Sequence, residues 1–326
     1  MRKFVFYALS VLCIPFFLIG LCSFMLPVLL ARGKVSGTTY EPFNSRLQWD
    51  LLGLRKDTAA RALARGLPAT NIVTRLVVFR LLTLICRISG YISPPLNFPA
   101  EDEKELSSMV AMRTEFFDRT MSGSIEDGDQ VVILGAGWDT RAYGLLKDRD
   151  VETFEVDTQA TQQVKLNALE KTGIEHSHVR FVACDFNQEC WLEKLRSHGF
   201  DPDTKTFVLW EGVTMYLTED AVGTTLDAVS SLPAGSRIAF DFLPAGWWTD
   251  SKLGHRAAQS ITVTYGENFT FFLQDEEGAE TALEALLNKH KLIAEERVIQ
   301  HLKEDESVCF YGMVLASCVG ESSTGD

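Results

Sequence analysis

The chain has 326 residues, of which 46% are hydrophobic, 23% charged and 10% aromatic, so a disordered, collagenous or repeat-only protein is excluded. At about 150 residues per domain, this length predicts two domains. The formal net charge is −13 and the basic residues form no long run, which argues against nucleic-acid binding. Seven cysteines without a disulfide framework or metal-ligand spacing indicate a reducing compartment and predict no metal site.

An uncharged apolar run opens the chain, from Phe4 to Ala31. Its 28 positions exceed the roughly 20 that a membrane-spanning helix needs and the roughly 7–15 of a cleaved signal peptide. We therefore predict an uncleaved transmembrane helix, with residues 1–34 as a membrane anchor. Basic residues nearly balance on its two sides, and the small excess after the run favours a single-pass protein whose remaining chain is cytoplasmic.

Residues 35–99 are predicted to form a helical extension that ends at a proline-rich boundary. The expected helices lie near Arg46–Leu54, Thr58–Arg65 and Ile72–Tyr91. In the third of these, Arg80, Thr83 and Arg87 share one helix face. Two interpretations stay open: a cationic helix on a membrane surface, or an ordinary helix packed on the body or on the anchor.

From residue 100 onward, apolar strands alternate with helices, which predicts an α/β domain over residues 100–320 and a flexible tail over 321–326. The architecture expected is a doubly wound, seven-stranded, mostly parallel sheet. Its strands are expected at Gln130–Leu134, Val151–Val156, Val179–Ala183, Thr206–Trp210, Arg237–Phe242, Lys291–Gln300 and Val308–Ser317. Its helices are expected at Glu101–Met121, Thr140–Leu146, Gln159–Thr172, Gln188–His198, Thr218–Ser231 and Ala279–His290. The last two strands would form an antiparallel hairpin at the edge. Leu243–Thr270 would form a lid, and its aromatic residues would either form an apolar wall for the substrate or simply pack over the end of the sheet.

A glycine turn, Gly135-Ala136-Gly137, directly follows the first of these strands. Glycine permits a tight turn and lets the backbone approach a ligand closely, and the start of the predicted next helix would add unpaired N–H donors. In an open α/β sheet, ligands bind at the carboxyl ends of the strands. The turn therefore predicts a ligand site at this edge of the sheet.

Acidic residues follow the next strands at the same edge. Asp157 ends the second strand, 20 residues after Gly137, where a carboxylate can accept both hydroxyls of a ribose. Asp185 and Phe186 follow the third strand and could hold an adenine by its amino group and its face. Glu211 follows the fourth. Together these residues indicate a nucleoside-containing cofactor.

The third residue after Gly137 discriminates between cofactors. Dinucleotide binders carry a third small residue where this chain has Thr140, which disfavours a pyrophosphate and favours S-adenosylmethionine. An NAD-dependent oxidoreductase remains the weaker alternative. The chain also lacks the catalytic Tyr-x-x-x-Lys pair expected of such an oxidoreductase, because Tyr216 is followed four residues later by Asp220.

Four motifs together, LGAGWDTR, FEVD, ACDF and LWEGVTMYL, resemble the leucine carboxyl methyltransferase family of class I S-adenosylmethionine-dependent enzymes. The resemblance covers about Met109 to Phe242 and leaves the chain before about Pro99 unexplained. It implies a Rossmann-like class I methyltransferase fold. It also implies cofactor contacts: Gly135, Ala136 and Gly137 beside the methionine part, Asp157 at the ribose, Asp185 and Phe186 at the adenine, Glu211 near the amino group, and Arg113, with Arg119 as second choice, at the carboxylate.

The resemblance implies methyl transfer, and the expected reaction is O-methylation of a carboxylate or hydroxyl on a small molecule or a chain-terminal carboxylate. The aromatic lid and the apolar N-terminal run favour a lipophilic acceptor. A carboxylate acceptor needs no base, whereas a hydroxyl needs one, for which Tyr216 and Glu211 are the candidates. The alternative of another class is a membrane-tethered scaffold that binds the cofactor without catalysis. The sequence leaves the oligomeric state open.

Overall fold

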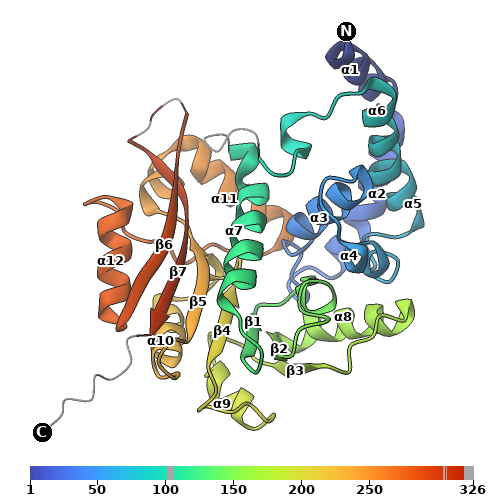
Figure 1. The fold of residues 1–326 in the computed structure, drawn as a ribbon. Coiled ribbons are helices and arrows are strands. Elements are labelled where there is room, and N and C mark those ends of the chain that lie inside the picture. Colours follow the sequence, from blue (N-terminus) through green and yellow to red (C-terminus); the bar gives the residue numbers. More distant parts are fainter. Residues whose placement is uncertain (101–105, 304, 306, 319–326) are drawn as a thin grey trace, which may run out of the picture.

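The computed structural model describes residues 1–100, 106–303, 305 and 307–318, and its centre is a single seven-stranded sheet (Figure 1). The strands in chain order are β1 (Gln130–Leu134), β2 (Glu152–Asp157), β3 (Val179–Ala183), β4 (Thr206–Trp210), β5 (Arg237–Phe242), β6 (Leu292–His301) and β7 (Cys309–Cys318). Their spatial order is β3-β2-β1-β4-β5-β7-β6. The first five strands pair in parallel, while β7 lies antiparallel between β5 and β6. The predicted mostly parallel sheet with an edge hairpin is confirmed.

The two faces of the sheet are covered by different helices because successive strand side chains point to opposite faces. In β1, Val131 and Ile133 join one hydrophobic cluster, whereas Val132 and Leu134 join another. The first cluster includes side chains of α7 (Met109–Ser124) and α8 (Gln159–Thr172). The second includes side chains of α9 (Trp191–Arg196), α10 (Glu219–Ser230) and α12 (Ala279–Lys289). The sheet is therefore covered on both faces, as a doubly wound fold requires.

The N-terminal third of the described chain is helical. Its elements are α1 (Arg2–Leu12), α2 (Ile14–Leu30), α3 (Tyr40–Leu52), α4 (Thr58–Leu63), α5 (Ile72–Thr74), the π-helical η1 (Arg75–Arg80) and α6 (Leu81–Ser89). Phe43 and Leu47 of α3 lie in the same hydrophobic cluster as Phe117 of α7. The helical extension thus packs on the sheet domain through a shared core, and the division into domains near Pro99 stays a prediction.

The apolar run at the N-terminus folds as two helices where one was predicted. Among the described residues no single helix is long and apolar enough to cross a bilayer; α1 and α2 meet that criterion only as a pair, across a 62° bend. Cys13 separates them and Pro15 occupies the first turn of α2, where its missing N–H removes no helical hydrogen bond. The prediction of one continuous transmembrane helix is therefore corrected.

The segment from residue 72 to 89 packs inside the N-terminal region. Its helices contact α1, α2 and α3. Thr83 is buried and accepts a hydrogen bond from Gln48 Nε2 at 3.0 Å, whereas Arg80 and Arg87 are exposed. The segment therefore packs on the body and on the apolar N-terminal helices, and the three residues do not form one exposed face. Whether its outer side also contacts a membrane surface stays open.

The loop after β1 also differs from the prediction. Instead of a helix over Thr140–Leu146 there is only the short 3-10 turn η4 (Arg141–Tyr143). Asp139 accepts a hydrogen bond from the backbone N–H of Arg141 at 2.7 Å, and the Arg141 side chain turns inward to carboxylates. The expected row of unpaired helix N–H donors is therefore absent from this described loop. Of the other expectations, residues 101–105 and the tail 321–326 lie outside the described residues.

Candidate active site

A cavity of about 450 Å³ lies at the carboxyl ends of β1, β2 and β4, within the size range of cofactor sites. All the residues predicted for the cofactor, and the candidate base Tyr216, line it: Arg113, Gly135, Ala136, Gly137, Asp157, Asp185, Phe186, Glu211 and Tyr216. The second-choice Arg119 does not; it is exposed and pairs with Glu296. The structure therefore brings together side chains spread over about 100 residues of sequence, while their individual roles stay predictions.

The glycine turn forms the floor of the cavity. Gly135 and Gly137 have φ values of +64° and +37°, which side-chain-bearing residues rarely adopt. A Cβ on Gly135 would lie 2.3 Å from a methyl of Val213, and one on Gly137 would lie 2.7 Å from a methyl of Thr39. Only glycine fits both positions, so bare backbone borders the cavity here.

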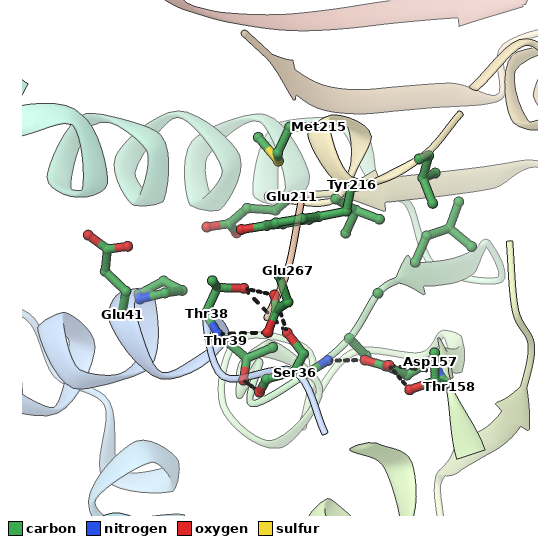
Figure 2. A pocket seen from close by; sticks show the side chains of 18 of the residues that line it. Ser36, Thr38, Thr39, Glu41, Asp157, Thr158, Glu211, Met215, Tyr216 and Glu267 are labelled. Atoms are coloured by element: carbon green, nitrogen blue, oxygen red, sulfur yellow. Dashed lines mark hydrogen bonds between the residues drawn. The ribbon is translucent and has the colours of Figure 1, made fainter. Parts of the chain in front are cut away.

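Asp157 stands at the end of β2, directly beside this turn (Figure 2). Its carboxylate accepts hydrogen bonds from the backbone N–H of Gly137 and of Thr158, both at 2.6 Å. Burial raises the pKa of Asp157 in spite of these bonds. The Thr158 hydroxyl donates a third, longer bond at 3.3 Å. A carboxylate offers about four acceptor sites, so one site remains for a ligand hydroxyl, and rotation of the Thr158 hydroxyl would free a second. The geometry fits the ribose-binding role predicted for this residue.

Asp185 and Phe186 follow β3 and line the same cavity. Asp185 is exposed, and its carboxylate accepts a hydrogen bond from the backbone N–H of Asn187 at 3.0 Å. Phe186 is half-buried and packs against the hydrophobic cluster on one face of the sheet. A polar acceptor beside a fixed aromatic ring is suited to hold a flat heterocycle.

Glu211, at the end of β4, is the centre of a buried cluster of arginines and carboxylates. Its Oε1 accepts from Arg113 Nε at 3.0 Å, and its Oε2 accepts from Arg46 Nη2 at 3.1 Å and from Arg141 Nη1 at 2.6 Å. Burial alone would raise the pKa of Glu211, but the three guanidinium groups outweigh it and lower the pKa. The carboxylate therefore stays ionised, and both of its oxygens are engaged.

Arg113, from α7, links this cluster to β5. Its Nη1 lies 3.7 Å from Oδ2 of Asp241, which is buried and also accepts a hydrogen bond from the hydroxyl of Tyr311. Arg113 and Glu211 thus present a cation and an anion side by side at the cavity. Such a pair can hold a zwitterionic amino-acid group, which needs a partner of each sign.

Arg46 and Glu267 also contribute to the site. Neither lies in a recognised motif, so the sequence did not identify them. From α3, Arg46 donates to Asp139 at 3.0 Å as well as to Glu211. At the cavity, the Glu267 carboxylate accepts from Gly37 N at 2.5 Å, Thr38 Oγ1 at 2.5 Å and Ser36 Oγ at 3.1 Å (Figure 2). We call Ser36–Thr39 together with Gly266–Phe269 the roof of the cavity. It joins segments about 230 residues apart.

The predicted lid contributes to this roof. Residues 243–270 contain the π-helical η6 (Gly246–Asp250) and α11 (Lys252–Tyr265). Trp248 and Phe269 line the cavity with Tyr216, and the ring centres of Tyr216 and Phe269 are 5.3 Å apart. Burial raises the pKa of the Tyr216 phenol well above its usual value, so the hydroxyl is protonated at neutral pH. One wall of the cavity is therefore aromatic, and Trp248 contributes to it, whereas Trp247 of the predicted lid packs in the core.

Residues 89–230 match the family model described as leucine carboxyl methyltransferase. The match covers less than half of the chain. The resemblance predicted from the four motifs is thus confirmed over the part of the chain that contains them. The family segment includes every predicted cofactor residue but leaves out Arg46 and Glu267, which lie on either side of it.

Curated relatives match the same region. A protein of Mycobacterium avium, provisionally named an S-adenosyl-L-methionine-dependent methyltransferase, is 33% identical over 178 residues, which is 53% of this chain and 57% of the relative. A protein of Mycobacterium ulcerans with the same provisional name is 36% identical over 146 residues, 44% of this chain and 48% of the relative. The chain thus spans about half the length of the curated relatives that it matches.

Among solved structures, geranyl diphosphate C-methyltransferase from Streptomyces coelicolor, in complex with S-adenosyl-L-homocysteine, aligns with a TM-score of 0.46 at 15% identity. The alignment covers 70% of this chain and 85% of that one. A phosphoethanolamine N-methyltransferase of Haemonchus contortus, in complex with S-adenosyl-L-methionine, aligns with a TM-score of 0.44 at 10% identity, over 64% of this chain and 53% of that one.

Proposed function

We propose that this chain is an S-adenosylmethionine-dependent methyltransferase. The observation that carries the proposal is the bare glycine turn beside the Asp157 carboxylate, at the carboxyl ends of parallel strands, within a segment of a methyltransferase family. The provisional names of the mycobacterial relatives agree with this cofactor and this activity.

Each part of the cofactor has a matching group in the cavity. Gly135 to Gly137 would lie along the methionine part, and Asp157 would accept the ribose hydroxyls. Asp185 and Phe186 would hold the adenine. Arg113 and Glu211 would hold the carboxylate and the ammonium group. When bound, the cofactor supplies an already activated methyl group, so the chain has only to align an acceptor with that methyl group and to keep water out.

The cavity supports transfer to an oxygen atom that needs no base. Tyr216 is protonated at neutral pH because its phenol is buried, and both oxygens of Glu211 are engaged by arginines. Neither candidate base is therefore poised to take a proton. A carboxylate acceptor is already ionised, on a small molecule or at a chain terminus, and it fits these constraints better than a hydroxyl does.

We propose that the acceptor is lipophilic and that the protein is attached to a membrane. The aromatic wall formed by Trp248, Phe269 and Tyr216 supports an apolar acceptor. The apolar helices α1 and α2 support attachment through the N-terminal segment, with the rest of the chain in the cytoplasm. This replaces the single continuous helix expected at first.

Calorimetric titration of the full chain in detergent with S-adenosylmethionine, S-adenosylhomocysteine and NAD tests the proposal. We expect micromolar binding of the two sulfur compounds, no binding of NAD, and at least about 100-fold weaker binding by Asp157→Ala, since two charge-assisted hydrogen bonds are lost. Asp203→Ala, an exposed aspartate far along the chain from the turn, is the control.

Transfer of a labelled methyl group to a panel of carboxylic acids then separates the remaining alternatives. Labelled products would support catalysis. Binding of the cofactor without turnover on any acceptor would favour a scaffold, and binding of NAD alone would favour an oxidoreductase and contradict the proposal.

A further inference from the structure

Exposed large hydrophobic side chains concentrate on the N-terminal helices. In the described part of the chain, 18 of the 22 such side chains lie within residues 1–88. Those on α1 and α2 are Phe4, Tyr7, Val11, Leu12, Ile14, Phe16, Leu18, Ile19, Leu21, Leu26, Leu29 and Leu30. A soluble monomer rarely exposes a contiguous apolar surface of this extent, which marks a site of contact with a partner or a membrane.

The helices that carry these side chains are already packed on the protein by their other faces. Phe6 of α1 is buried in a cluster with Ile85 and Cys86 of α6. Gly20 lets α2 approach η1 so closely that a Cβ there would lie 2.4 Å from a methyl of Val78. A helix that crossed a bilayer away from the body would have to give up these contacts.

Polar contacts tie α2 to the body in the same way. The hydroxyl of Ser23 donates to Asn71 Oδ1 at 2.9 Å, and Asn71 Nδ2 donates to the carbonyl of Ser23 at 3.1 Å. At the end of α2, Arg32 Nη2 donates to the carbonyl of Thr262 on α11 at 3.2 Å. These bonds fix the C-terminal half of α2 with one side inward and the other side outward.

The exposed apolar surface continues beyond the N-terminal run. Ile72, Leu76, Leu84 and Ile88 are exposed and follow one another at spacings of four or eight residues along α5, η1 and α6. The π-helical turns of η1, wider than an α-helix, help to keep such a four-residue spacing on one side. We call the outer sides of α1, α2 and α5–η1–α6 together the N-terminal face.

The charge of this region is opposite to that of the rest. Residues 1–100 contain 12 Lys and Arg and 3 Asp and Glu, a formal charge of +9, whereas residues 101–326 contain 19 and 41, a formal charge of −22. Arg65, Arg75 and Arg80 form no ion pair in the described part of the chain. Apolar side chains flanked by unpaired cations match the acyl and headgroup layers of an anionic lipid surface.

We propose that the N-terminal face lies flat in one leaflet of an anionic bilayer, with α1 and α2 in the interface instead of across the membrane. The link that follows α2, Gly33 to Val35, lines the cavity, and exposed Val263 on α11 is next to Thr262, which bonds Arg32 at the end of α2. The cavity therefore borders the proposed lipid contact, where a lipophilic acceptor enters from the leaflet. The docking itself does not depend on the proposed methyl transfer; the acceptor route does.

Photolabelling from the lipid phase tests the docking directly. The full chain is bound to vesicles of phosphatidylcholine and phosphatidylserine that contain an apolar diazirine, and the labelled residues are mapped by mass spectrometry. We expect labels on Leu76, Leu84 and Ile88 as well as on α1 and α2, and none on Ile293, which is exposed on β6. Labels confined to residues 4–31 would indicate a spanning segment and overturn the proposal.

A matched pair of variants tests the same surface by affinity. Leu84 and Ile88 are 52% and 61% exposed, and Ile293 is 55% exposed, so Glu at any of them leaves the core intact. We expect L84E/I88E to bind the anionic vesicles at least about tenfold more weakly in flotation, and I293E to bind like the native chain. Equal binding by both variants would contradict the proposal.

Two further outcomes also decide the question. A tag at Met1 is expected to be digested by protease added on the side of the body; protection of the tag by sealed vesicles would overturn the flat arrangement. The chain could instead form a dimer without detergent, bury residues 72–88 in that dimer and fail to float with the vesicles. That result would show that the N-terminal face binds a second copy of the chain and would overturn the proposal. Cofactor titration on the same samples keeps a failure of docking distinct from a failure of the proposed catalysis.

Discussion

The N-terminal hundred residues and the rest of the chain differ in nearly every surface property, yet they build one cavity. The first region has a formal charge of +9 and exposes most of the large apolar side chains, whereas the second has a formal charge of −22 and buries nearly all of its own. Arg46 and Thr38 come from the first, Glu211 and Glu267 from the second, and they meet at the cavity. The comparison shows that a region outside the family motifs can still supply side chains that complete the cavity.

The largest effect is expected where the two regions join. Glu211→Gln removes the charge that three buried guanidinium groups share, and we expect the free energy of unfolding to fall by about 3–5 kcal/mol because uncompensated buried charge remains. Urea denaturation measures this. Glu295→Gln, which weakens a partly exposed pair with Arg237, is the control and should cost less than about 1 kcal/mol. Equal losses would show that the cluster is not a shared electrostatic centre.

Arg46 tests how much the N-terminal region adds to that centre. Arg46→Met keeps a long apolar stem but removes hydrogen bonds to Asp139 and Glu211, which keep Arg141 as a partner. We expect a loss of about 2 kcal/mol in unfolding free energy, together with weaker cofactor binding. Arg65→Met, at an exposed position, should change stability by no more than about 0.5 kcal/mol. Full stability of Arg46→Met would mean that the regions are joined by apolar packing alone.

The roof offers a smaller effect that separates binding from folding. Glu267→Gln keeps the shape but weakens the acceptor for Gly37, Thr38 and Ser36. We expect about tenfold faster dissociation of S-adenosylhomocysteine, equivalent to about 1.4 kcal/mol, and faster hydrogen exchange at the Gly37 amide. Glu277→Gln, an exposed glutamate before α12, should leave both unchanged. If hydrogen exchange at the Gly37 amide were unchanged, Glu267 would not be what holds the roof closed.

The smallest effect is expected at Tyr216. Because burial keeps its phenol protonated, Tyr216→Phe should change kcat by less than about threefold on a carboxylate acceptor. Tyr265→Phe, which packs on Gly37 in the roof, provides the comparison. A fall of roughly 100-fold or more with Tyr216→Phe alone would identify Tyr216 as an acid–base group and favour a hydroxyl acceptor.

The strand pattern predicted the sheet well because most strands are short apolar runs that need no distant partner to be recognised, while β6 (Leu292–His301) is bounded by turn residues and contains charged residues. All seven expected strands are present within about one residue of their predicted bounds. The helix expected after Gly137 is absent because Arg141 is drawn to carboxylates on α7 and β4, contacts that no local pattern encodes. The apolar N-terminal run was correctly found to be helical, but its division at Cys13 and its packing on α6 were not.

The sequence by itself determined the order of strands and helices along the chain, the match of residues 89–230 to the leucine carboxyl methyltransferase family model and the set of strand-end residues at the cavity. These follow from short-range patterns: apolar periodicity, glycine where φ is positive, and acidic residues that end strands. Only the tertiary structure decided that Arg46 reaches Glu211, that Glu267 holds the roof, and that α1 and α2 lie against the body. Such contacts join residues up to about 230 positions apart, and their energy depends on burial and geometry that exist only once the chain is folded.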